Sequence, residues 1–427
     1  MKEGSVVSIH IASEASAPMQ LIKEVRAFPG RGLEGDRYFT GIGFYSKKPS
    51  HGGREVTLIE TETVEALFRG VLNAAGERLG IKLTAAETRR NIATSGVPLS
   101  HLVDREFQVG AVRMRGTRLC EPCKHLEELT QPGVLSGLIH RGGLRALILN
   151  EGIIHVGDVI RMLDTQYDAN YGNFQTSLYE EIRREAFGED IGQTSWLTAD
   201  EQDRFLKWLD LSPEKTLLDV ACGAGGPALR IAAATGCSIV GIDVHEKAVA
   251  AASAVAAHRG LAERAEFQAA DATQPLPFSD ARFDAITCID AINHLHDRER
   301  VIAEWARLLK PSGRLLFTDP TTVTGALTSA EIKARSSAGF YLFVPQGYNE
   351  RIIAQHGLRL LIYEDVPANA AKSAEARRAA RALRSAALRE IEGDPEYARQ
   401  QEFLAVAGRV AREGRLSRFV YVSQKLS

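Results

Sequence analysis

Acidic residues at the ends of two predicted strands, with a glycine turn after the first, are the feature of this chain best suited to chemistry. Residues 217–228 predict a buried strand carrying Asp219, a turn with Gly223 and Gly225, and the start of a helix. The next predicted strand ends in Asp243. Glycines without a Cβ let a backbone approach a ligand closely, and a carboxylate after the second strand suits a ribose diol. The sequence therefore predicts a nucleoside-binding site at the carboxyl edge of a parallel sheet.

Two cofactor classes could use such a site. The glycine spacing in residues 223–228, with Asp243 about 20 residues further on, also satisfies the loose dinucleotide-binding fingerprint. Asp219 favours S-adenosylmethionine, because a carboxylate at that point can face a sulfonium and an ammonium but not a pyrophosphate. A third acidic strand end, Asp271 followed by Ala272, points the same way.

The elements that follow carry a family resemblance. They are a strand at 283–289, a helix at 298–309, a turn at 310–313 and a strand at 314–318. In this order, and with the motifs above, the chain resembles the class I S-adenosylmethionine-dependent methyltransferases over roughly residues 165–427. The resemblance implies an α/β Rossmann-like domain with a seven-stranded sheet, and its last two strands are expected at 358–363 and 418–422.

The resemblance also implies roles for the cofactor-binding residues. Asp219, Gly223 and Gly225 would line the methionine moiety, and Asp243 would bind the ribose hydroxyls. The adenine edge would face Asp271 and Ala272.

Acceptor-facing residues are expected just beyond the fourth and fifth strands of the sheet. Asp290 stands at the end of the fourth strand, and His294 after it is a candidate general base, although a histidine there can also cap or pack the next helix. Gln193 belongs to a segment expected to close on the cofactor. The candidate acceptor contacts are Tyr341, Tyr348 and Asn349.

Two helical stretches accompany the predicted sheet. Residues 174–209 predict two helices ahead of the first strand, with a capping box at Thr198 and Glu201. Residues 370–415, between the last two strands, are rich in Ala, Arg and Glu at helical spacing. Such an insertion lies over the substrate mouth or forms a subunit contact, and a solvated decoration is the alternative. The oligomeric state stays open, with a dimer among the options.

The first part of the chain has a different character. Short alternating strands separated by glycine turns predict a β-barrel-like domain, interrupted by one helix at 61–79. The pattern changes near residue 164, so we expect two domains, 1–163 and 164–427.

This first domain carries its own motifs, at 32–37, 51–56, 88–92, 119–123, 140–146 and 152–158. On these motifs, residues 5–163 resemble the MOSC family, named for the C-terminal domain of molybdenum-cofactor sulfurase. The resemblance implies that Cys123 carries a persulfide or ligates molybdenum, with sulfur arriving from a donor protein. Lys124, His125 and the pair Arg89-Arg90 could lower the pKa of that thiol. The alternative is that Cys120 and Cys123 are two ordinary buried cysteines.

Composition limits the classes of function. The 427 residues carry a net charge of −2, so no basic excess indicates nucleic acid, and no stretch approaches the roughly 18 apolar residues of a membrane span. Five cysteines, mostly in predicted core segments, argue against a disulfide framework. We expect a cytoplasmic protein without a membrane or nucleic-acid partner.

The function expected from these observations is methyl transfer from S-adenosylmethionine to a heteroatom of a small molecule. Sulfur is favoured over nitrogen or oxygen, because a thiolate needs little base catalysis and a MOSC domain would handle sulfur. The alternative is a sulfur or metal carrier whose second domain only senses S-adenosylmethionine.

Overall fold

The computed structural model describes residues 4–47, 54–72, 78–162, 171–337, 339 and 341–426. The chain divides into two compact units, Met1–Leu163 and Asp164–Ser427, and each is described by itself.

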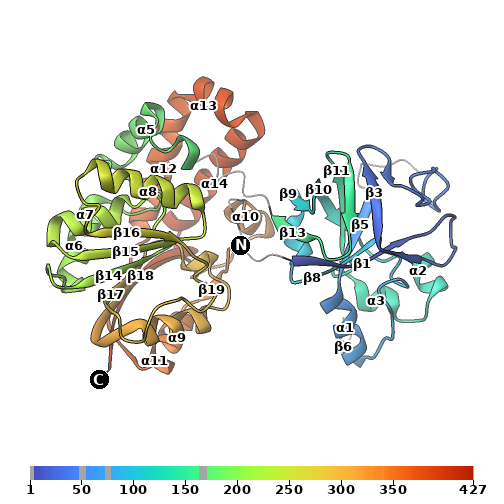
Figure 1. Ribbon diagram of the computed structural model, residues 1–427, viewed down its shortest axis with the longest axis horizontal. Coiled ribbons are helices and arrows are strands. Elements are labelled where there is room, and N and C mark those ends of the chain that lie inside the picture. The colour runs from blue at the N-terminus through green and yellow to red at the C-terminus, as the bar shows by residue number, and fades with distance from the viewer. Residues whose placement is uncertain are drawn as a thin grey trace. The chain divides into compact units, whose positions relative to one another are not determined.

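The first unit is built on a closed β-barrel (Figure 1), which confirms the barrel-like prediction. Seven strands follow one another in the order β13-β9-β10-β11-β5-β8-β1, and an antiparallel pairing of β1 with β13 closes the ring. The strands are β1 (Gly4–Ile11), β5 (Val56–Glu60), β8 (Ile92–Ser95), β9 (Glu106–Val109), β10 (Val112–Leu119), β11 (Leu144–Ile148) and β13 (Val159–Met162). The inward side chains fill the barrel with an apolar core that includes Ile9, Leu58 and Phe107.

Smaller elements decorate the barrel. β2 (Gln20–Ile22) pairs with β1 in antiparallel fashion. A separate small sheet is formed by β12 (Gly152–His155), β3 (Glu24–Phe28) and β4 (Gly32–Leu33). The short helices are η1 (Leu99–Leu102), α2 (Lys124–Leu129) and α3 (Val134–Leu138).

The single helix predicted at 61–79 is wrong in its second half. α1 covers Thr61–Arg69 and ends at Gly70, whose φ of 94° an α-helix cannot continue through. A hairpin of β6 (Val71–Leu72) and β7 (Arg78–Leu79) follows instead, and the residues between these two strands lie outside the described ranges.

The second unit is a doubly wound α/β domain. Its sheet runs β16-β15-β14-β17-β18-β21-β20, with only β21 antiparallel to its neighbours. These strands are β14 (Thr216–Val220), β15 (Ser238–Asp243), β16 (Ala265–Ala269), β17 (Phe283–Cys288), β18 (Leu309–Val323), β20 (Leu358–Asp365) and β21 (Leu416–Lys425). The expected seven strands are joined by an eighth, the two-residue β19 (Val344–Pro345), which pairs with the end of β18.

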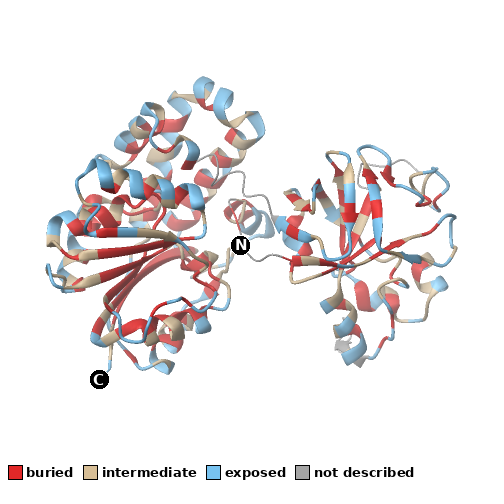
Figure 2. Ribbon diagram, in the orientation of Figure 1, coloured by how far each residue is buried: buried red, intermediate tan, exposed pale blue. Residues whose placement is uncertain are grey.

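Helices cover both faces of this sheet (Figure 1). One face packs against α6 (Ala199–Leu209), α7 (Gly226–Thr235) and α8 (Glu246–His258). The other packs against α9 (Arg298–Leu308) and α11 (Tyr348–Gln355). Consecutive residues alternate between the two cores, as Leu217 and Leu218 do, so the strands are apolar on both faces. Figure 2 shows these strands as the most continuously buried part of the unit.

A helical layer stands beside the sheet. The insertion between β20 and β21 forms α12 (Pro367–Leu383), α13 (Ser385–Glu392) and α14 (Asp394–Arg412). α12 packs against α14 and against α5 (Ser177–Phe187), and α14 also contacts α10 (Ser329–Arg335). Among the helices that the structure describes, none combines the length and the apolar content of a membrane span.

Candidate functional site

The two glycines of the turn between β14 and α7 have different neighbours. At Gly225, whose φ is 75°, a Cβ would come within 2.8 Å of Ala252, so this glycine allows α7 and α8 to approach each other. At Gly223 a Cβ would instead meet the Tyr171 hydroxyl at 3.1 Å and Thr194 Oγ1 at 3.7 Å. The backbone of Gly223 therefore faces Tyr171 and Thr194, which cover the strand ends. The lack of a side chain at Gly225 is explained by the close packing of α8.

Two buried carboxylates flank this turn. Asp219 on β14 and Asp243 at the end of β15 are 6% and 5% exposed. The Gly223 N–H donates to Asp243 Oδ2 at 2.9 Å, so the same carboxylate fixes the turn. The Thr287 hydroxyl donates to Asp219 Oδ1 at 2.7 Å. The structure thus brings together three of the predicted cofactor residues at one strand edge.

Burial governs the protonation of both carboxyl groups. It raises the pKa of Asp219 to about 7, with the charge of Asp243 adding to the rise and the bond from Thr287 opposing it. Burial also raises the pKa of Asp243, although the N–H groups of His245 and Gly223 oppose that rise. A cation placed beside Asp219 would favour its ionised form and draw a proton from it near neutral pH.

The third predicted strand end lies next to these residues in the sheet. Asp271 follows β16, which pairs in parallel with β15. Its Oδ1 accepts bonds from the Thr273 N–H at 2.9 Å and the Thr273 hydroxyl at 2.7 Å. Burial acts to raise the pKa of Asp271, but these bonds to Thr273 contribute to a net lowering. Ala272 is buried against the core of the sheet.

Asp290, which the sequence predicts as a catalytic group, is held in a buried network of hydrogen bonds. Its Oδ1 accepts bonds from Arg418 Nε at 2.6 Å and from the Thr318 hydroxyl at 2.7 Å. Its Oδ2 accepts the Trp196 N–H at 2.9 Å. Both oxygens of this carboxylate are engaged and its side chain is 2% exposed, so Asp290 holds the loop at Trp196 in place.

Arg418 is the counterion at the centre of that network. It is fully buried and also pairs with Glu201 Oε1 through Nη1 at 2.7 Å. Burial lowers the pKa of Arg418, and the two carboxylates more than offset this, so the net direction is upward. Thr198 Oγ1 accepts the Glu201 N–H at 3.3 Å, but the Glu201 carboxylate turns to Arg418, so only half of the expected capping box forms.

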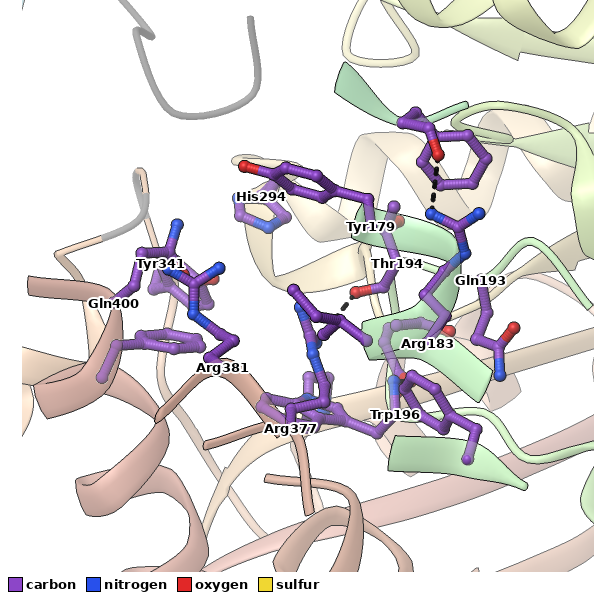
Figure 3. Close-up of a pocket in the computed structure, with 17 residues that line it drawn as sticks. Tyr179, Arg183, Gln193, Thr194, Trp196, His294, Tyr341, Arg377, Arg381 and Gln400 are labelled. Atoms are coloured by element: carbon purple, nitrogen blue, oxygen red, sulfur yellow. Dashed lines mark hydrogen bonds between the residues drawn. The ribbon is translucent and has the colours of Figure 1, made fainter. Parts of the chain in front are cut away.

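A pocket lies between the stretch 174–196, the ends of the central strands and the helical insertion at 367–412 (Figure 3). It encloses about 950 Å³ of empty space, including the part open to solvent. Its described lining residues are Phe174, Tyr179, Ile182, Arg183, Phe187, Gln193, Thr194, Ser195, Trp196, Asp290, His294, Pro320, Tyr341, Arg377, Arg381, Gln400 and Phe403. Both helical stretches singled out in the sequence therefore contribute to one cavity, and Thr194 connects that cavity to the Gly223 turn.

Asp290, His294 and Tyr341, which were expected near the acceptor, all line this pocket. His294 is half-buried at the end of η2 (Ile292–His294), and its ring meets that of Tyr341 edge-on with centroids 4.6 Å apart. Gln193 also lines the pocket, but its side-chain oxygen accepts the Ile191 N–H at 3.0 Å and so shapes its own loop.

Tyr348 and Asn349, the other two predicted acceptor contacts, are not among the described residues that line this pocket. Tyr348 packs against the core of the sheet at the start of α11. Asn349 is 1% exposed and donates from Nδ2 to Asp319 Oδ2 at 2.8 Å. Asp319 in turn forms a fully buried ion pair with Arg298 at 2.5 Å. Neither buried arginine–carboxylate pair could be recognised from the sequence, because the partners are far apart along the chain.

In the first unit, Cys123 stands at the N-cap of α2 and is half-buried, whereas Cys120 is 1% exposed. A hydrogen bond with Cys123 is the main cause that raises the pKa of Tyr45 to about 12, and the charge of Arg145 opposes the rise. Arg90 does not belong to this surface: its guanidinium is buried and donates to the carbonyl of Cys120 at 2.7 Å. Of the two cysteines, Cys123 is the more exposed, and it packs partly against an apolar cluster that includes Leu67 and Leu126.

Comparison with known proteins identifies both units. A family model described as a MOSC domain matches residues 48–161, and one described as a methyltransferase domain matches residues 218–317. The 27-O-demethylrifamycin SV methyltransferase of Amycolatopsis mediterranei is 35% identical over 154 residues, which cover 36% of this chain and 56% of the relative. The glycine/sarcosine/dimethylglycine N-methyltransferase of Actinopolyspora halophila is 30% identical over 186 residues, which cover 42% and 31%. This chain thus spans about half of the curated relatives' length, or less.

Solved structures agree on the fold of the second unit. A putative sarcosine dimethylglycine methyltransferase from Galdieria sulphuraria superposes with a TM-score of 0.53 at 20% identity, covering 62% of this chain and 98% of that one. The cyclopropane synthase MmaA2 from Mycobacterium tuberculosis gives 0.52 at 20% identity, covering 61% and 98%. This chain therefore carries a MOSC domain followed by a methyltransferase domain of the class I fold.

Proposed function

We propose that the chain is an S-adenosylmethionine-dependent methyltransferase that acts on a heteroatom of a small molecule. The observation that carries this proposal is the junction at Gly223. There, a strand edge with two buried carboxylates, Asp219 and Asp243, opens toward a segment whose Thr194 lines the pocket of about 950 Å³. A cofactor bound at the strand edge and an acceptor bound in the pocket would meet at this junction.

The residues at the strand edge fit the cofactor. Asp219 would bind the positive charge of its methionine part, Asp243 the ribose hydroxyls, and Asp271 with Ala272 would border the adenine. The glycine at position 223 supports this fit, because a Cβ there would lie 3.1 Å from the hydroxyl of the covering Tyr171 and leave less room for a ligand between them. When bound, S-adenosylmethionine supplies a methyl group on a sulfonium that is already a good leaving group.

The chain then has to align the acceptor and exclude water. Alignment of two reactants can contribute roughly 7–11 kcal/mol, so few chemical groups are needed. Among the described lining residues, His294 is the group best placed to hold or accept a proton, since the Asp290 carboxylate is engaged by Arg418. Few other groups in the described lining could take a proton, and we therefore further propose that the acceptor atom is sulfur, because a thiolate requires little help from a base.

We also propose that Cys123 is the functional residue of the MOSC domain, as a persulfide carrier or a molybdenum ligand. Its partial exposure and the nearby Tyr45 and Arg145 support this role. Among the described residues no three His, Cys, Asp or Glu side chains gather around a metal position. Molybdenum would therefore need its own organic ligand, to which Cys123 adds one thiolate. A fused carrier would keep a sulfur acceptor at high effective concentration.

The test is formation of S-adenosylhomocysteine by the full-length protein with a metabolite extract. Asp243→Ala should weaken S-adenosylmethionine binding by roughly 1.5–3 kcal/mol, the range for hydrogen bonds to a charged group. Glu266→Ala, on an exposed position of the neighbouring strand, is the matched control. Cofactor binding without turnover on any extract would favour a sensor over an enzyme. Unchanged affinity in a folded Asp243→Ala protein would contradict the site itself.

A further inference from the structure

Aromatic side chains are concentrated in the lining of the pocket (Figure 3). Six of its seventeen described lining residues are Phe, Trp or Tyr, whereas these three types make up 7% of the whole chain. The six are Phe174, Tyr179, Phe187, Trp196, Tyr341 and Phe403. The imidazole of His294 adds a seventh ring. Flat side chains at this density favour contact with a flat ligand.

Four of these rings form a connected row. His294 meets Tyr341 with centroids 4.6 Å apart, and Tyr341 meets Phe403 at 6.3 Å. Phe403 stacks on Trp196 at 6.1 Å with an interplanar angle of 15°. The four residues come from η2, the segment after α10, α14 and the loop before α6. The fold therefore assembles one aromatic surface from segments far apart in the sequence.

The ends of this row lie where the chemistry is proposed to occur. His294, at one end, is the lining residue best placed to hold a proton. Trp196, at the other end, follows Thr194 by two residues, and Thr194 Oγ1 lies 3.7 Å from the position of a Cβ on Gly223. A heteroatom on a ligand packed against these rings would therefore lie close to the strand edge that the cofactor would occupy.

Trp196 is held in place by hydrogen bonds on both sides of its backbone. Its N–H donates to Asp290 Oδ2 at 2.9 Å, and its carbonyl accepts the hydroxyl of the buried Ser373 at 3.3 Å. The first bond comes from the end of β17 and the second from α12. A surface that is fixed before the ligand arrives loses less conformational entropy on binding, so contact with it contributes more to affinity.

The charged side chains of the described lining are bonded within the protein. Asp290, the one carboxylate among them, pairs with Arg418 at 2.6 Å and so offers little to an ammonium group. Arg183 and Arg381 pair with carboxylates of the protein at 2.8 and 2.6 Å, and Arg377 donates to a backbone carbonyl at 3.3 Å. The rings therefore offer a ligand more than these charges do.

We propose that the methyl acceptor is an uncharged aromatic molecule whose ring system packs against the row formed by His294, Tyr341, Phe403 and Trp196. Its heteroatom is carried on the ring or on a short side chain. Aliphatic molecules of the same size bind less well, because they lack the ring-to-ring contacts of a flat aromatic ligand. This inference rests on the proposed function and adds the chemical class of the acceptor.

The experiment compares three ligands on the full-length protein saturated with S-adenosylhomocysteine. They are 2-(2-naphthyl)ethanethiol, its saturated decahydronaphthyl counterpart, and 6-(2-mercaptoethyl)-2-naphthoate. The first two carry the same thiol on the same spacer, so they differ in the aromatic character and flatness of the ring system. Calorimetry should show the naphthyl compound binding roughly three- to tenfold more tightly than the saturated one, and at least as tightly as the carboxylate.

Variants assign this preference to the rings. Phe403→Leu keeps an apolar side chain in the row, and it should lower the ratio of naphthyl to decahydronaphthyl affinity to about half or less. Tyr341→Leu, at a half-buried member of the row, repeats the test if Phe403→Leu does not fold. Ile182→Ala is the matched control: this aliphatic residue lines the same pocket, so its loss should weaken both ligands by the same factor. If Phe403→Leu or Tyr341→Leu also weakens both ligands equally, the rings supply only apolar area and the proposal is overturned.

The outcomes distinguish this inference from the function on which it rests. If S-adenosylhomocysteine itself does not bind, the proposed function fails. If it binds, three results overturn the acceptor class alone: equal affinities for the naphthyl and decahydronaphthyl compounds, no binding of either, or binding of the carboxylate more than about tenfold tighter than that of the uncharged compound.

Discussion

Replacing Asp219 by asparagine tests how the buried carboxyl takes part in cofactor binding. Burial raises the pKa of this group to about 7, and a positively charged cofactor needs the ionised form. The ionised fraction rises about tenfold between pH 6 and pH 8, so the affinity of the wild-type protein for S-adenosylmethionine should rise by a similar factor. Asp219→Asn keeps the shape of the side chain and removes this titration.

The loss of cofactor affinity in Asp219→Asn at a fixed pH follows from the same contact. At pH 8, Asp219→Asn should weaken S-adenosylmethionine binding by roughly 1.5–3 kcal/mol, because a hydrogen bond to a charged group is lost. Near pH 7 the wild-type protein should release about half a proton on binding, and the variant should lose this contribution.

The free energy of unfolding of the ligand-free wild-type protein should fall as pH rises, whereas its affinity for the cofactor should rise. The folded protein holds a proton on Asp219 between the ordinary carboxyl pKa of 3.8 and about 7, so this group lowers the free energy of unfolding as pH rises through that interval. The penalty is absent below pH 4 and complete above pH 7, with an upper limit of about 4 kcal/mol. Asp219→Asn without ligand should therefore be more stable than the wild type at pH 8 and equal to it near pH 4.

Isothermal titration calorimetry at pH 6, 7 and 8, in buffers of different ionisation enthalpy, measures both affinity and proton release. Comparison with the variant cancels the titration of the cofactor's own groups. Parallel pH profiles for the two proteins, with equal proton release, would refute the assignment of Asp219 to the cofactor's positive charge.

Three further predictions concern the scaffold and the first domain. Arg418→Met should lower the free energy of unfolding by about 3–5 kcal/mol in urea titrations, because the buried carboxylates of its two partners lose their counterion; a loss below 1 kcal/mol would contradict the network. Gly225→Ala should cost about 1–3 kcal/mol more than Gly260→Ala, which also has a positive φ but open space around it; equal losses would show that packing does not matter there. Alkylation followed by mass spectrometry should label Cys123 faster than the buried Cys120, and equal inertness of both thiols would remove the chemical basis of a carrier.

The strands of the second domain could be predicted because their signals are local. A run such as 217–220, mostly apolar and followed by glycines, specifies a buried parallel strand without knowledge of its neighbours. Asp219 and Asp243 meet because parallel strands end at the same edge of a sheet. The helix predicted at 61–79 failed because Gly70, with its positive φ, ends it after Arg69.

The acceptor side of the site was predicted less well, for a physical reason. Asp290 was correctly expected at the pocket, but its partner Arg418 lies 128 residues away, and a sequence does not show which carboxylate a distant arginine will bind. Tyr348 and Asn349 follow the fifth strand as expected, yet α11 turns them into the core. Arg377, which lines the pocket, could not be predicted as a lining residue, because the composition of its helix indicated only helical spacing.

The most direct test of the account is a crystal structure of the full-length protein with S-adenosylhomocysteine. We predict that the ribose hydroxyls bond to the Asp243 carboxylate, that the amino group lies beside Asp219, and that the sulfur faces the pocket lined by His294 and Tyr341. A ligand bound away from the β14–β15 edge, or with its sulfur turned from that pocket, would contradict the account.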